Sequence, residues 1–236
     1  DAEGALSDAL QAVSIQPSWA KAYHRKATAL KALGRPRDAA QACDEGLAAA
    51  AGAAEEGELK ELKKLRQVMA SAAAALALQG WWNGKVSEPL GGFEQEFHFM
   101  PHGNLSCCVY GEELPGDYEL KDVELAASGA LNGGLDVCLN SAKVPYLFKV
   151  TSDGLLHLCC PMKSPEERPR TFDGPGYVGM QPGRVAMSAA AELAGLSAGQ
   201  RILRYLDELY EVMAEHRPAS TSAGSSSRAD ELREAL

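Results

Sequence analysis

At 236 residues, the chain is long enough for one large domain or two small ones, each able to bury its own core. Hydrophobic residues make up 46% and charged residues 23%, and no run approaches the roughly 18 apolar residues that a membrane-spanning helix needs. The net charge of −9 falls mainly in residues 79–183, where it would repel a phosphate backbone. We therefore expect no nucleic-acid partner and no membrane partner.

The cysteines and the first residues of the chain bear on its location. The six cysteines include two adjacent pairs, Cys107 with Cys108 and Cys159 with Cys160, and adjacent cysteines are strained as disulfides. They do not form a disulfide framework, so we expect a reducing, cytoplasmic location. The chain opens on Asp1 without an initiator methionine or a secretory signal, which indicates a fragment or a processed chain.

Residues 1–78 are predicted to be helical, because helix-forming residues dominate and apolar positions recur at intervals of three and four. Small or apolar residues also repeat at a spacing of 34. The matching positions are Ala5, Ala9, Ala12 and Val13, then Ala39, Cys43, Gly46 and Leu47, with Tyr23, Ala27 and Leu30 on the intervening helix and Gly34 at the turn. Helices that cross closely require small residues at such positions.

The string PSWAKAYHRKATALKALGRPRDAAQACDEGL, residues 17–47, resembles a tetratricopeptide repeat, which is a helical hairpin. The resemblance places Asp1 in the middle of a repeat, so we expect an array that is truncated at its N-terminus. A following helix is predicted to cap the stack with one apolar side. Its apolar residues are Leu59, Leu62, Leu65, Met69 and Leu76.

Two cations on the predicted repeat are candidate binding residues. Lys21 and Arg25 lie four residues apart and so share one helix face. The string KAYHRKATAL is similar to the third repeat of chaperone-binding tetratricopeptide proteins, and that resemblance implies that this pair grips acidic C-terminal peptides of Hsp70 or Hsp90. The alternative is a solvated pair of charges.

Residues 79–183 change to short alternating runs that are separated by Gly, Pro, Asn and Asp, which predicts strands. The candidate strands are 80–87, 93–100, 104–111, 117–126, 134–139, 145–151, 154–160 and 176–181, with turns at PHGN, LPGD, NGG, SDG and DGPG. Strands of this number and spacing predict an antiparallel barrel or sandwich. The G-x-W pattern at Gly80–Trp82 resembles the first strand of lipocalin-like barrels, and residues 144–180 resemble a small lipocalin-like family without a settled activity.

A barrel of this size either fills with its own side chains or holds one small ligand. Aromatic residues at strand spacing are candidates to line such a cavity, and they would serve equally well as plain core. They are Trp81, Trp82, Phe97, Tyr118, Tyr146 and Phe148.

Metal and enzyme signatures are missing from the sequence. His98, His102 and His157 are suitable ligand types, as are the paired cysteines, but no C-x-x-C or H-x-x-x-H spacing appears. The sequence contains no Walker loop, no G-x-S-x-G elbow, no dinucleotide fingerprint and no H-E-x-x-H. We therefore expect no metal and no cofactor, and we favour a binding protein over an enzyme.

The predicted fold class is α+β. Tetratricopeptide hairpins in residues 1–78 precede a lipocalin-like antiparallel β-barrel in residues 79–183, a C-terminal helical segment in residues 184–217 and a disordered tail in residues 218–236. The expected function is that of a protein–protein interaction adaptor, in its finer form a co-chaperone. The alternatives are a carrier that holds a small apolar ligand in the barrel, and an enzyme with its active site at the barrel mouth.

Overall fold

The computed structural model describes residues 1–85, 94–109, 112–161, 167–172 and 176–183. Its contacts divide the chain into two units. The first contains residues 1–78 and 120–133, and the second contains residues 79–119 and those from 134 on. The predicted C-terminal helix in residues 184–217 and the predicted tail in residues 218–236 lie outside the described residues.

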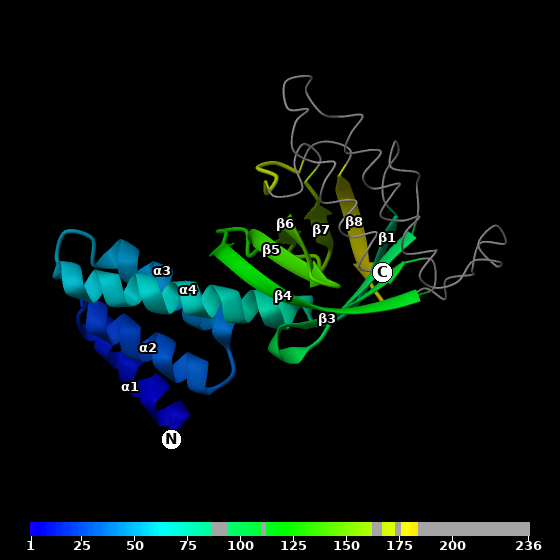
Figure 1. The fold of residues 1–236 in the computed structure, drawn as a ribbon. Helices are drawn as coiled ribbons and strands as arrows, with labels where there is room; N and C mark the ends of the chain where they lie inside the picture. Colours follow the sequence, from blue (N-terminus) through cyan, green and yellow to red (C-terminus); the bar gives the residue numbers. More distant parts are fainter. Residues whose placement is uncertain (86–93, 110–111, 162–166, 173–175, 184–236) are drawn as a thin grey trace, which may run out of the picture. The chain divides into compact units, whose positions relative to one another are not determined.

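Residues 1–78 form the helices that the sequence predicts (Figure 1). They are α1 (Ala2–Ile15), α2 (Ala20–Ala32), α3 (Pro36–Ala49) and α4 (Glu56–Leu78). The side chain of Asp1 accepts a hydrogen bond from the backbone N–H of Glu3 and so caps α1. The turn between α2 and α3 depends on Gly34, which has a φ of +70°. Within the described residues, no helix is long and apolar enough to cross a bilayer.

The α2–α3 hairpin is held together by close contact between small residues. Ala27, Ala39 and Cys43 expose none of their surface. A Cβ atom added to Gly46 would lie 2.5 Å from the Cβ atom of Tyr23, which is shorter than any normal contact between carbon atoms. The hairpin therefore accepts no larger residue at Gly46 without movement of α2 or α3.

Two of the predicted inward positions face solvent instead. Ala5, in the second turn of α1, is exposed, and Ala9 is the buried residue of that helix. Leu76 of α4 exposes 55% of its surface. The buried face of α4 starts at Leu62 and Met69 but then drifts around the helix toward Ala74, which leaves Leu76 on the outer side.

The strands form one closed antiparallel barrel in which each strand pairs with the next in the sequence (Figure 1). They are β1 (Gly80–Lys85), β2 (Glu94–Phe99), β3 (Asn104–Val109), β4 (Glu112–Leu125), β5 (Leu131–Leu139), β6 (Ala142–Val150), β7 (Leu156–Cys159) and β8 (Tyr177–Pro182). The barrel closes where β1 pairs with β8, with Trp82 opposite Pro182 and Gly84 opposite Met180. The α+β class and the antiparallel barrel are thus confirmed.

Two of the predicted turns are wrong. The LPGD sequence lies inside β4, where Pro115 is opposite Ser106 of β3, and the NGG sequence lies inside β5. A Cβ atom on Gly116 would lie 2.2 Å from the carbonyl oxygen of Cys138, and one on Gly133 would lie 2.8 Å from that of Lys121. These glycines are required because other backbone passes very close to them, and not because the chain reverses there.

Strand alternation explains how the barrel interior is filled. Trp82 of β1 lies opposite Phe97 of β2, and Phe97 lies opposite Cys107 of β3. Successive residues of a strand point to opposite faces, so this cross-strand row belongs to one face of the sheet. All three of these residues are buried.

Candidate functional site

A groove lies between α2 and α4 in the helical unit. Its volume is about 400 Å³. The residues that line it are Ala20, Lys21 and His24 of α2, Glu55 before α4, and Gly57, Glu58 and Glu61 of α4. The groove thus places one of the two predicted clamp cations in a concavity whose opposite wall is acidic.

Lys21 is exposed and engaged at the same time. Its ammonium lies 2.9 Å from a carboxylate oxygen of Glu58, yet 62% of the Lys21 side chain is accessible to solvent. The hydrogen bond from Lys21 to Glu58 and the negative charge of Glu58 raise the pKa of Lys21. The structure therefore keeps this cation charged and within reach of an incoming anion.

Arg25 shares the face of α2 with Lys21, one helical turn further along. Its guanidinium lies 5.6 Å from the ring centroid of Trp19, which is within the range of a cation–π contact. Stacking on an aromatic ring orients the guanidinium and leaves its edge available for a carboxylate. Lys21 and Arg25 are thus brought to one helix face, as the sequence predicts.

The acidic wall of the groove is the feature that the sequence analysis missed. Glu55, Glu58 and Glu61 recur every three residues along the start of α4, so the spacing alone places them on neighbouring positions of one helix side. This spacing alone predicts an acidic side at the start of α4. It does not predict that this side faces Lys21, because that depends on how α4 packs along α2.

The aromatic residues predicted to line a barrel cavity lie in the interior, with one exception. Trp82, Phe97, Tyr118, Tyr146 and Phe148 are buried. Phe97 makes edge-on ring contact with Tyr146 at 6.1 Å between centroids, and Tyr118 makes one with Phe99 at 5.1 Å. Phe97 and Phe148 expose none of their surface, so protein atoms surround both rings.

Trp81 is the exception, because it points to the opposite face of β1 from Trp82. Its indole stacks on the imidazole of His98, the cross-strand neighbour on β2, with ring centroids 4.4 Å apart and planes within 9°. The two-residue period of a strand already separates these adjacent tryptophans. Trp81 therefore does not share a cavity wall with the other predicted residues.

A few polar groups lie among the aromatic rings of the barrel. The amide nitrogen of Gln95, a residue that is 4% exposed, donates to the sulfur of Cys107 at 3.9 Å. Burial raises the pKa of Cys107 to about 12. Burial also raises the pKa of Tyr146 well above its ordinary value, and the nearby thiols of Cys160 and Cys107 act in the same direction. These groups are neutral at physiological pH.

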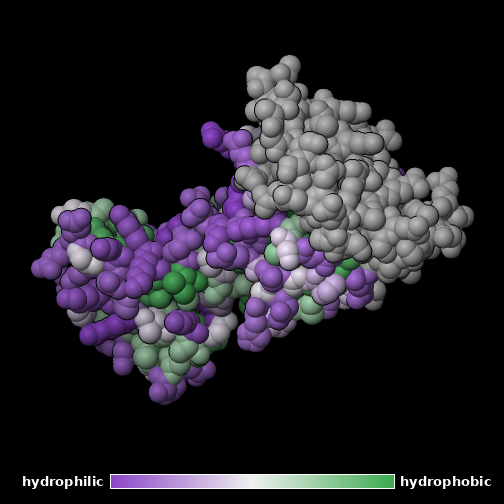
Figure 2. Space-filling view, viewed as in Figure 1, coloured by the Kyte–Doolittle hydropathy of each residue, from purple (hydrophilic) through white to green (hydrophobic). Residues whose placement is uncertain are grey.

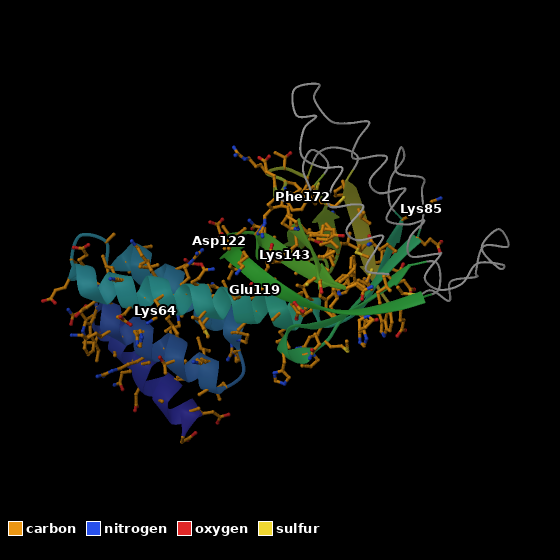
Figure 3. The ribbon with its side chains drawn as sticks, viewed as in Figure 1. Lys64, Lys85, Glu119, Asp122, Lys143 and Phe172 are labelled. Carbon is orange, nitrogen blue, oxygen red and sulfur yellow. The ribbon has the colours of Figure 1, made fainter. Side chains whose placement is uncertain are left out.

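A buried carboxylate on the second unit is neutralised by two cations. Asp136 of β5 is 6% exposed, and it accepts hydrogen bonds from Arg168 and, at 2.8 Å, from Lys143 of β6, which is labelled in Figure 3. The Arg168 guanidinium fits against the backbone of Gly134, where a Cβ atom would overlap it. This cluster fastens the segment that contains Arg168 to the strand, so its role is structural.

Charged clusters that could hold a metal are missing from the described part of the chain: it contains no group of three or more His, Cys, Asp or Glu side chains in a suitable arrangement. The visible surface of the helices in Figure 2 is mostly hydrophilic and carries a small hydrophobic patch. Among the large apolar side chains that the structure describes, Leu10, Ile15, Val68 and Leu76 are exposed.

Comparison of the chain with protein-family models, with curated proteins and with solved structures finds no match to any of them.

Proposed function

We propose that this protein is a protein–protein interaction adaptor whose helical unit binds a peptide in the α2–α4 groove. The observation that carries the proposal is the placement of Lys21, exposed and charged, in a concavity of about 400 Å³ with Arg25 on the same helix face. Two cations at this spacing suit the carboxylate at the end of a peptide chain, which offers two oxygens to separate donors.

In its finer form, the proposal is that α1 to α3 are tetratricopeptide helices and that the ligand is an acidic C-terminal peptide of Hsp70 or Hsp90. The tight contact between Gly46 and Tyr23 supports this, because small residues at the helix crossing are what the repeat pattern requires. A peptide carboxylate at Lys21 competes with Glu58 and weakens its ion pair. Exposed ion pairs contribute only about 0–1 kcal/mol, so a peptide carboxylate with two cationic partners outweighs that loss.

The barrel is proposed to be lipocalin-like and to act as a second recognition module. Its support is the eight-stranded antiparallel order together with the buried Trp82 of the G-x-W pattern on β1. The adaptor is proposed to work in the cytoplasm, where thiols such as Cys107 stay reduced.

The test is fluorescence anisotropy of a labelled acidic chaperone C-terminal peptide with the 236-residue protein. The double variant Lys21→Ala/Arg25→Ala is expected to bind at least about tenfold more weakly, since each hydrogen bond to a charged group is worth about 1.5–3 kcal/mol. A C-amidated peptide is expected to lose a similar factor.

The control is Lys31→Ala, which removes one positive charge from the last turn of α2, at a residue that, unlike Lys21, does not line the groove. If the acidic peptide fails to bind the folded protein, or if the double variant and Lys31→Ala bind it equally well, the clamp is wrong. Lys21 and Arg25 are then solvated charges, and the search for a ligand moves to the barrel.

A further inference from the structure

We propose that Glu58 determines the specificity of the α2–α4 groove by holding the Lys21 ammonium, so that a peptide carboxylate must compete with Glu58 for this cation. This inference rests on the proposed function, because it assigns an internal competitor to the same site.

The geometry of the ion pair supports this role. Glu58 Oε1 lies 2.9 Å from Lys21 Nζ, at the distance of a good charge-assisted hydrogen bond. Only 21% of the Glu58 side chain is exposed, against 62% for Lys21. The carboxylate is therefore the well-held partner, and the ammonium is the one that solvent and ligands can reach.

The position of Glu58 at the start of α4 stabilises its carboxylate as the partner of Lys21. It lies in the first turn of α4, where the partial positive charge of the helix N-terminus stabilises an anion. The hydrogen bond to Glu58 and the negative charge of Glu58 raise the pKa of Lys21. An ordinary solvated lysine would offer its charge without competition, whereas a ligand at Lys21 competes with the carboxylate of Glu58.

A different lysine on the same helix shows that the contact is specific to the groove. Lys26 pairs with Glu45 of α3 at 2.6 Å, and only 17% of its side chain is exposed. That pair braces the hairpin and is closed to ligands. The Lys21–Glu58 pair differs because its cation lines a groove that is large enough for several peptide atoms.

The test compares Glu58→Gln with Glu56→Gln in the 236-residue protein. Both substitutions remove one negative charge from the first turn of α4, but it is Glu58 that lines the groove and holds the Lys21 ammonium. The probe is the labelled acidic peptide with a free C-terminal carboxylate. We expect Glu58→Gln to bind it about fivefold more tightly than wild type, because a surface ion pair no longer has to be broken.

Glu56→Gln is expected to change the affinity by less than about twofold, because solvent and salt screen a charge that lies outside the groove. The C-amidated peptide should gain less from Glu58→Gln than the free-acid peptide, because it lacks the C-terminal carboxylate and keeps only its acidic side chains. Thermal unfolding followed by circular dichroism would check that both variants fold alike.

The outcomes separate this inference from the proposed function. If the wild-type protein binds the acidic peptide and the two variants tighten binding equally, or neither does, Glu58 is not a competitor and only this inference falls. If none of the three proteins binds the peptide, the proposed function falls, and this inference falls with it. Tighter binding by Glu58→Gln alone supports both.

Discussion

The α2–α3 hairpin and the barrel interior are both closely packed, but with side chains of opposite size. At the helix crossing the core is tight because Gly46 and Ala27 have small side chains or none, which lets the two helix backbones approach closely. In the barrel the core is made of large rings, since Phe97 and Phe148 fill the space that the strands enclose. The hairpin should therefore tolerate no addition of atoms, and the barrel should tolerate no removal.

The largest effect is expected from removing a ring from the barrel. Phe97→Ala should lower the free energy of unfolding by about 3–5 kcal/mol, because it removes a fully buried ring that contacts Phe99 and Tyr146. Urea unfolding followed by tryptophan fluorescence would measure this. Leu76→Ala, which removes apolar atoms from a residue that is 55% exposed, should stay within about 0.5 kcal/mol. Similar losses for the two variants would contradict a filled interior.

The next effect is expected from adding one carbon to the hairpin. Gly46→Ala should destabilise the protein by about 1–3 kcal/mol, since the new Cβ would lie 2.5 Å from Tyr23 and the helices must separate. The matched control is Gly57→Ala in α4, where a Cβ meets no atom within 4 Å. That variant should be neutral or more stable, by up to about 1 kcal/mol, because alanine favours a helix over glycine. Thermal unfolding of both variants would measure these changes in stability. A Gly46→Ala variant that is more stable than wild type would contradict a close contact between α2 and α3 at this residue.

The smallest expected effect is a dependence of the free energy of unfolding on pH. It can be compared between one buried thiol of the hairpin and one of the barrel. Burial raises the pKa of Cys43 in α3 and of Cys107 in the barrel, each to about 12 from an ordinary value of 9.0. The folded protein therefore holds the thiol proton more tightly than the unfolded chain. Its stabilising contribution is complete below pH 9 and is lost as the pH rises from 9 to 12.

Between pH 9 and 10, each thiol should thus lower the stability of the fold by about 1 kcal/mol. Urea titrations at the two pH values would measure the loss, and Cys43→Ala or Cys107→Ala should each reduce it. We expect similar reductions for the two variants, because burial raises the pKa of both thiols to about 12. An unchanged pH dependence in both variants would show that other groups cause the loss.

Much of the fold could be predicted from local pattern. Helical periodicity located the four helices of residues 1–78, and alternation located all eight strands within a few residues. The two errors in turn placement share one cause. The sequence predicts turns at Gly116 and Gly133, but these residues lie in β4 and β5, where close backbone leaves no room for a side chain. A glycine looks the same in the sequence whether it serves a turn or a close approach.

The candidate site was predicted in part. Lys21 and Arg25 share a helix face because they are four residues apart, and the sequence alone determined that. The prediction that Trp81 and Trp82 line one cavity, in contrast, neglects the two-residue period of a strand, which points adjacent side chains to opposite faces. Local geometry settles both questions, because the residues involved lie on one element.

Only the tertiary structure decided what these residues meet. Lys21 finds Glu58 because α4 returns along α2, and Asp136 finds Arg168 from a segment beyond β7. Gly116 and Gly133 look like turn residues in the sequence, but they lie against neighbouring backbone because distant strands pack there. Periodicity describes which residues share a face, but the partner of that face depends on contacts between distant parts of the chain. The sequence thus determined the elements and their faces, and the packing of those elements decided which charges form the groove.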